Sequence, residues 1–168
     1  FDGIDFEQTG TAAINYGIYI TAKLNDGARH NVFKNGIIST TNAFTGTRGV
    51  YMSRQIPATS VEGTNSYNRF LNMTVQQCMT GYHLEGYPTY FKDIGNEINT
   101  EGNGNSLIQN LGSFTVSGFV FGVYADAMDN FILQHTEVKN MLGPIGSALG
   151  GISIAHGDSF NISYNSVH

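Results

Sequence analysis

Short stretches in which apolar and polar residues alternate recur along the whole chain, separated by segments rich in Gly, Asn, Ser and Thr. Alternation with a period of two residues is typical of β-strands, and the intervening residue types favour turns and loops. One pattern consists of a glycine, an apolar residue, any residue, and an apolar or small residue. Its five copies are residues 17–20, 49–52, 81–84, 122–125 and 151–154.

A second pattern alternates with the first: an apolar residue, any residue, a polar ring or amide, any two residues, and then Ile or Val. Its copies are residues 33–38, 70–75, 133–138 and 162–167, and a fifth copy begins at 108–110. The glycines of the first pattern lie 32, 32, 41 and 29 residues apart. A repeat of this length with two short strands suits one turn of a parallel β-solenoid, whose turns stack about 4.8 Å apart. A propeller needs four strands per blade and more even spacing.

Stacked turns predict where the repeated side chains lie. Apolar positions such as Ile18 and Ile20 fill the interior, and the residue between them points outward. We expect an outer row of rings that either stack on one another or contact sugars, formed by Tyr19, Tyr51, His83 and Tyr124. We also expect a buried structural ladder, in which side chains bond to the turns above and below, formed by Asn35, Asn72, Asn110 and His135.

The order of residue types also carries a resemblance. Residues 31–38, Asn-Val-Phe-Lys-Asn-Gly-Ile-Ile, alternate with residues 49–52, Gly-Val-Tyr-Met, and this alternation resembles right-handed parallel β-helix repeats. Pectate lyases, polygalacturonases and phage tailspikes share that architecture. A narrower similarity, to very large surface and secreted proteins of Bacteroidota, rests on residues 64–72, 81–86, 94–98 and 103–110. It implies export by the type IX secretion system.

We therefore predict an all-β fold, a right-handed parallel β-helix of about five rungs that takes up residues 1–168 as one segment. We expect the chain to be a fragment of a longer solenoid, uncapped at both ends, with flanking domains of the same chain as partners. Loops at about 53–67 and 86–106 would interrupt the rungs and carry any specificity.

The composition argues against nucleic-acid binding and against a membrane-spanning segment. Charged residues make up 12% of the chain, about half the usual share, and the net charge is −5. An acidic chain with scattered basic residues is not expected to bind nucleic acid. No apolar run approaches the length of a membrane span. The single cysteine, Cys78, flanks an apolar run and is expected to be a buried thiol.

The sequence offers few groups for catalysis. Lyases of this fold need clustered carboxylates for calcium and a basic residue, and hydrolases need two or three carboxylates in a cleft. Stacking would bring Asp126 or Asp129 near Asp158, and we expect these acids to be exposed and unpaired, with no metal. His30 and His83 have no evident carboxylate partner. We assign no catalytic residue and no cofactor.

The predicted function is a structural or adhesive rod segment of a large exported bacterial protein, extracellular or at the cell surface. It would meet the secretion machinery in transit and would contact extracellular glycans through its loops or its outer rings. Two alternatives stay open: a polysaccharide lyase or glycoside hydrolase of the pectate-lyase-like type, and a phage tail-spike shaft. An enzymatic role is not the favoured interpretation, but the sequence does not decide it.

Overall fold

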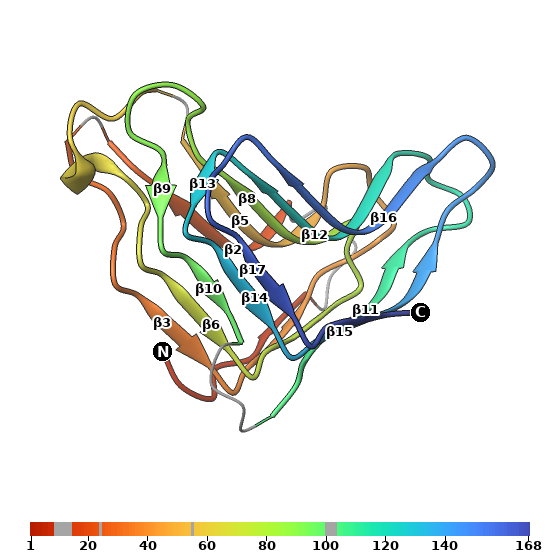
Figure 1. The fold of residues 1–168 in the computed structure, drawn as a ribbon. Helices are drawn as coiled ribbons and strands as arrows, with labels where there is room; N and C mark the ends of the chain where they lie inside the picture. Colours follow the sequence, from red (N-terminus) through yellow and green to blue (C-terminus); the bar gives the residue numbers. More distant parts are fainter. Residues whose placement is uncertain (9–14, 24, 55, 100–103) are drawn as a thin grey trace.

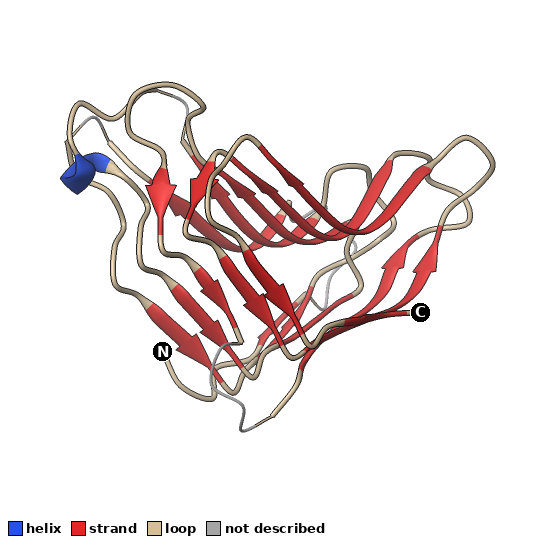
Figure 2. Ribbon diagram, in the orientation of Figure 1, coloured by secondary structure: helices blue, strands red, loops and turns tan. Residues whose placement is uncertain are grey.

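The structure, a computed structural model, describes the whole chain except residues 9–14, 24, 55 and 100–103. It is a parallel β-solenoid of about five turns, which confirms the predicted fold class (Figure 1). Strands dominate, and the one short helical turn of the described residues is a 3-10 turn, η1(Val61–Gly63) (Figure 2). Asn103, with which one phrase of the Bacteroidota resemblance begins, lies outside the described residues.

Three parallel sheets run along the solenoid, and a fourth, small sheet joins two short strands. The first sheet consists of β1(Phe6–Glu7), β4(Ile37–Ser39), β7(Thr74–Gln76), β11(Ser106–Gly112), β15(Thr136–Leu142) and β18(Ser166–Val167). The second consists of β3(Val32–Lys34), β6(Arg69–Leu71), β10(Glu97–Ile98), β14(Ile132–Gln134) and β17(Asn161–Ser163). The third consists of β2(Tyr16–Thr21), β5(Arg48–Ser53), β8(Thr80–Glu85), β12(Phe119–Asp126) and β16(Ala148–Ala155). The small sheet pairs β9(Asp93–Ile94) with β13(Met128–Asp129).

The third sheet contains all five copies of the glycine pattern in the predicted register. Its interior row is Ile18, Val50, Tyr82, Val123 and Ile152. The glycines are required because neighbouring backbone and core side chains come very close. A Cβ on Gly122 would lie 2.5 Å from the carbonyl oxygen of Gly151 and 2.5 Å from Cγ1 of Val138.

The second pattern aligns as predicted except in the third full turn. Phe33, Phe70, Leu133 and Ile162 lie in one row, but the residue between Phe70 and Leu133 is Ile98. Ile108 instead pairs with Val75 and Val138 in the first sheet. The fifth copy was therefore assigned to the wrong strand, because the connection after Ile98 is longer than in the other turns.

Part of the two predicted loops is regular structure. The segment 53–67 contains η1, and the segment 86–106 contains both β9 and β10. Buried polar residues stabilise these connections: Asp93 accepts a hydrogen bond from the backbone N–H of Asn65 at 2.8 Å. Among the described residues, no helix is long and apolar enough to cross a membrane.

Candidate functional site

The predicted outer rings lie side by side on the third sheet. Tyr19, Tyr51, His83 and Tyr124 occupy equivalent positions on β2, β5, β8 and β12. Tyr19 and Tyr51 stack at 5.3 Å between ring centroids, and Tyr16 stacks against both. His83 meets Tyr51 edge-on at 5.1 Å and lies tilted against Tyr124 at 4.9 Å. The rings therefore contact one another along the row, by stacking between Tyr19 and Tyr51 and at an angle on both sides of His83. Sugar contact by these residues stays a prediction.

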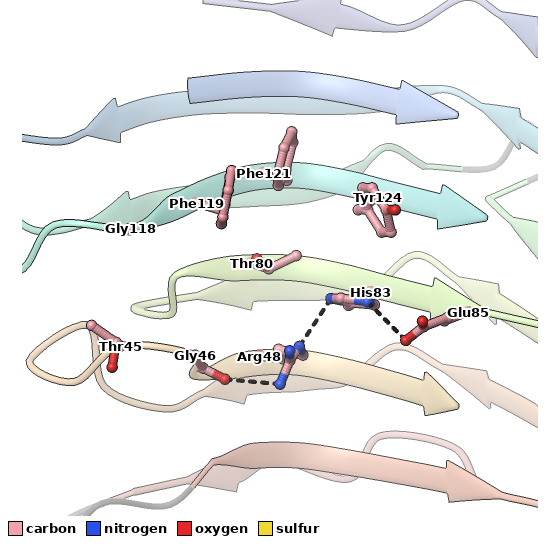
Figure 3. A pocket seen from close by; sticks show the side chains of 10 residues that line it. All are labelled: Thr45, Gly46, Arg48, Thr80, His83, Glu85, Gly118, Phe119, Phe121 and Tyr124. Carbon is pink, nitrogen blue, oxygen red and sulfur yellow. Dashed lines mark hydrogen bonds and ion pairs between the residues drawn. The ribbon is translucent and has the colours of Figure 1, made fainter. Parts of the chain in front are cut away.

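A pocket of about 440 Å³ opens beside His83 and Tyr124, at one end of this row. Figure 3 shows its lining on three neighbouring strands and the loops before two of them. The lining residues are Thr45, Gly46, Arg48, Thr80, His83, Glu85, Gly118, Phe119, Phe121 and Tyr124. The volume is within the range of small-molecule sites.

Loop length explains why the hollow forms here. The first and third sheets are joined by residues 40–47 in one turn, 77–79 in the next and 113–118 in the one after. The short middle connection leaves a notch between two longer ones. Thr45 and Gly46 of the first loop and Gly118 of the third form part of its wall.

The polar centre of the pocket is a row of three side chains. The Nε–H of Arg48 donates a hydrogen bond of 2.9 Å to Nδ1 of His83. Nδ1 is therefore an acceptor, and the ring proton lies on Nε2, which is 3.4 Å from Oε2 of Glu85. Arg48 also donates to the carbonyl oxygen of Gly46 at 3.1 Å (Figure 3). Its guanidinium lies 4.3 Å above the ring of Tyr51.

This environment fixes the charge of His83. Burial, and next the positive charge of Arg48, lower the pKa of His83 to about 4. The ring is thus neutral at pH 7. Burial and the nearby carboxylate of Asp126 raise the pKa of Tyr124, whose hydroxyl donates to Asp126 at 3.4 Å. The expectation that His83 lacks a carboxylate partner was wrong, because Glu85 lies two residues further along the same strand.

The predicted acidic edge exists, but its acids are paired. Asp129 and Asp158 lie on neighbouring turns, with Nζ of Lys92 at 3.1 Å from the first and 3.5 Å from the second. Asp126 is 2.9 Å from Nδ1 of His156. The expectation of unpaired acids was therefore wrong, because Lys92 comes from a loop whose path the sequence did not predict.

The predicted ladder residues lie at the outer corners of the turns. Asn35 and Asn72 are exposed and take left-handed backbone conformations, and the Asn72 amide donates to Oδ1 of Asn35 at 2.9 Å. Asn110 is exposed at a different corner, where it accepts a hydrogen bond from Asn140. The expected burial of these three amides was wrong. Asparagine tolerates a positive φ better than most residues, which explains its recurrence there.

His135 occupies the same corner as Asn35 and Asn72. Its ring stacks on that of Tyr164 in the next turn, with centroids 5.0 Å apart and planes 6° apart. The position therefore accepts either amides, which bond along the row, or rings, which stack. Tyr67 and His30 form a similar stacked pair at the preceding corner, at 5.0 Å.

A buried amide ladder does exist, at positions that the sequence patterns did not single out. Oδ1 of Asn68 accepts hydrogen bonds from the backbone and side-chain N–H groups of Asn31 at 3.2 and 2.9 Å. The backbone N–H of Asn68 donates to Oδ1 of Asn96 at 2.9 Å. In the next turn, the buried Phe131 takes this position. The ladder is therefore three residues long, with Asn68 and Asn96 buried and Asn31 partly exposed at its end.

The described residues show no cluster suited to a metal: no group of three or more His, Cys, Asp or Glu side chains lies close enough to hold an ion. Cys78 is buried as predicted, and burial raises the pKa of its thiol to about 12. Of the ten lining residues the sequence patterns singled out only His83 and Tyr124, and the charged and aromatic ones missed are Arg48, Glu85, Phe119 and Phe121. Glu85 follows His83 by two residues, which is the outward-facing spacing, but Arg48, Phe119 and Phe121 stand at odd spacings before Tyr51 or Tyr124, where strict alternation places a side chain inside.

Comparison with protein-family models, with curated proteins and with solved structures gives no match for this chain. The fold is defined by the structure itself: a parallel β-solenoid with an aromatic and polar pocket on one outer face. The similarity to Bacteroidota surface proteins stays a sequence-based prediction.

Proposed function

We propose that this chain is a structural and adhesive rod segment of a large exported bacterial surface or secreted protein, and that it contacts glycans through the outer face of its third sheet. One observation carries the proposal: aromatic side chains from successive turns collect on that face in register, beside a pocket with polar groups at its centre. Aromatic faces edged by hydrogen-bonding groups suit sugars, which have apolar C–H faces and hydroxyl rims.

The rod role is supported by the continuity of the interior. Parallel pairing joins each turn to the next in all three main sheets, so that backbone hydrogen bonds run along the solenoid axis. Inside, the rows of aliphatic and aromatic side chains are buried along most of the axis. Such stacking gives a stiff element whose backbone offers few sites to proteases.

The experiment is a binding survey of the purified chain against immobilised neutral and anionic polysaccharides, with affinities measured by calorimetry for those that bind. The same mixtures are tested for new reducing ends and for the ultraviolet absorbance of unsaturated products. The proposal expects binding to at least one polysaccharide and no product. Absence of binding to every polysaccharide would contradict the proposed contact, and product formation would replace it with the lyase or hydrolase alternative.

A further inference from the structure

The ring faces that a sugar would need are not equally available along the outer row. Tyr16, Tyr19 and Tyr51 stack on one another, and the guanidinium of Arg48 lies over Tyr51. Each of these rings therefore already has a face in contact with protein groups, and Tyr19 keeps 46% of its surface exposed. Beside the Tyr124 end of the row, Phe119 keeps 72% of its surface exposed and lines the pocket.

Phe119 is part of a small aromatic floor. Its ring is nearly parallel to that of Phe121, with planes 10° apart and centroids at 6.3 Å, and Phe121 is tilted against Tyr124 at 5.5 Å. All three side chains project from one strand, β12, on the outer side (Figure 3). A planar ligand face of modest size would find its apolar contact here and not over Tyr19 and Tyr51.

The polar groups across the pocket from these three rings hold one another in place through hydrogen bonds. Arg48 uses one N–H on His83 and one on Gly46, which holds the guanidinium in place and leaves other N–H donors for a ligand. The carboxylate of Glu85, with its side chain 45% exposed, supplies acceptors. Donors and acceptors thus lie close together, which suits hydroxyl groups, because a hydroxyl both donates and accepts.

The charge of the pocket decides the kind of sugar. Arg48 is the single cation among the ten lining residues, all of which the structure describes, and Glu85 balances it. His83 is neutral at pH 7, and the carboxylate of Asp126 lies next to the pocket on Tyr124. An anionic sugar would therefore meet no surplus of positive charge, within a chain of net charge −5.

We propose that the pocket between residues 40–47 and 113–118 binds an uncharged sugar unit of a glycan, with its apolar face on Phe119 and its hydroxyls on Arg48 and Glu85. This inference rests on the proposed glycan contact and narrows it to one place and one class of ligand. It is narrower than the sequence-based expectation, which placed the contact on the loops or on the outer rings.

The test compares three soluble probes by calorimetry at pH 7. The neutral polysaccharides xyloglucan and galactomannan form one arm, and polygalacturonate forms the other. We expect binding in the neutral arm, weakened about tenfold by Phe119→Ala and unchanged by Phe114→Ala. Phe114 is a matched control because its exposure is also 72% and it does not line the pocket.

A second variant separates neutral from anionic recognition. Glu85→Gln keeps the shape of the side chain and removes its charge, so it should weaken binding of the neutral probe severalfold. If the pocket recognised an acid, the same variant would strengthen binding of polygalacturonate, because it removes a repulsion.

The outcomes separate this inference from the proposed function. Tighter binding of polygalacturonate, or equal effects of Phe119→Ala and Phe114→Ala, would overturn the inference and leave the proposed glycan contact standing. Absence of binding in both arms and in the wider survey would contradict both. Circular dichroism of each variant checks that the solenoid is intact.

Discussion

The buried amide ladder offers the sharpest test of how this solenoid is held together, through the substitution Asn68→Asp. The side chain of Asn68 is fully buried. Its Nδ2 donates to the carbonyl oxygen of Ala28 at 2.9 Å and to Oδ1 of Asn96 at 3.2 Å. Asp has the same shape but no N–H group, so both acceptors would face a carboxyl oxygen instead of a donor.

The magnitude follows from these two contacts and from the new charge. A buried acceptor left without its donor costs about 1–3 kcal/mol. A carboxyl in this position either stays ionised without a cation among its hydrogen-bond partners or takes up a proton, at 1.36 kcal/mol per unit of pKa change. Together these effects should lower the free energy of unfolding by roughly 3–5 kcal/mol at pH 7. The loss should shrink toward pH 4, because the raised pKa of the introduced carboxyl destabilises the fold only where the unfolded chain is ionised.

Urea unfolding followed by circular dichroism measures this loss, with Asn72→Asp as the control. Asn72 has the same chemical change at an exposed corner, where its backbone conformation suits Asp equally well. The control should change the free energy of unfolding by less than about 1 kcal/mol. Equal effects of the two substitutions, or a larger effect at position 72, would refute the buried ladder.

Three further predictions concern single positions. As pH falls from 6.5 toward about 4, His83 takes up a proton in the unfolded chain before it does so in the folded chain. The free energy of unfolding should therefore decline by roughly 1–3 kcal/mol over this range. Urea titrations of the His83→Gln variant should show a smaller decline. Gly122→Ala should lower the free energy of unfolding by about 1–3 kcal/mol, because its Cβ would lie 2.5 Å from Cγ1 of Val138. Gly118→Ala is the control and should change the free energy of unfolding by less than about 1 kcal/mol. Similar urea unfolding midpoints for the two variants would contradict this. The Cys78 thiol, with its pKa raised to about 12, should resist a thiol reagent until denaturant unfolds the chain, and rapid labelling without denaturant would show that it is accessible.

The glycine pattern made the third sheet predictable from sequence. Each glycine lies within a strand, where a Cβ would collide with a core side chain and, in four of the five, also with the backbone of the next turn, so its position fixes the register directly. Once Gly49 and Gly81 are aligned, Tyr51 and His83 must be neighbours on the outer face. The steric requirement for glycine at one position of the strand therefore fixed the register of the other residues of that strand.

The amide ladder was not predictable in the same way. Asn68 and Asn72 are four residues apart, and each belongs to its own column of asparagines: Asn68 bonds to Asn31 and Asn72 bonds to Asn35 in the neighbouring turn. One column bonds in the interior and the other bonds at a left-handed corner. The repeat of the residue type is the same in both, and only the path of the backbone separates them.

Predicting the pocket requires information that a repeat pattern does not contain. It forms because residues 77–79 make a short connection between two longer ones, and its Arg48, His83 and Glu85 come from two neighbouring strands. The row of rings predicted one of these residues, His83. The others required knowledge of which loops flank the strand.

The central claim, that a sugar contacts the pocket and not the stacked tyrosines, is tested most directly by a protein NMR titration. A neutral oligosaccharide from the polysaccharide that binds is added to isotopically labelled protein, and the ring and backbone signals are followed. The account predicts the largest shifts at Phe119, Phe121, Tyr124 and Arg48, with little change at Tyr19. Shifts centred on Tyr19 and Tyr51, or spread over the chain without a centre at the pocket, would contradict it.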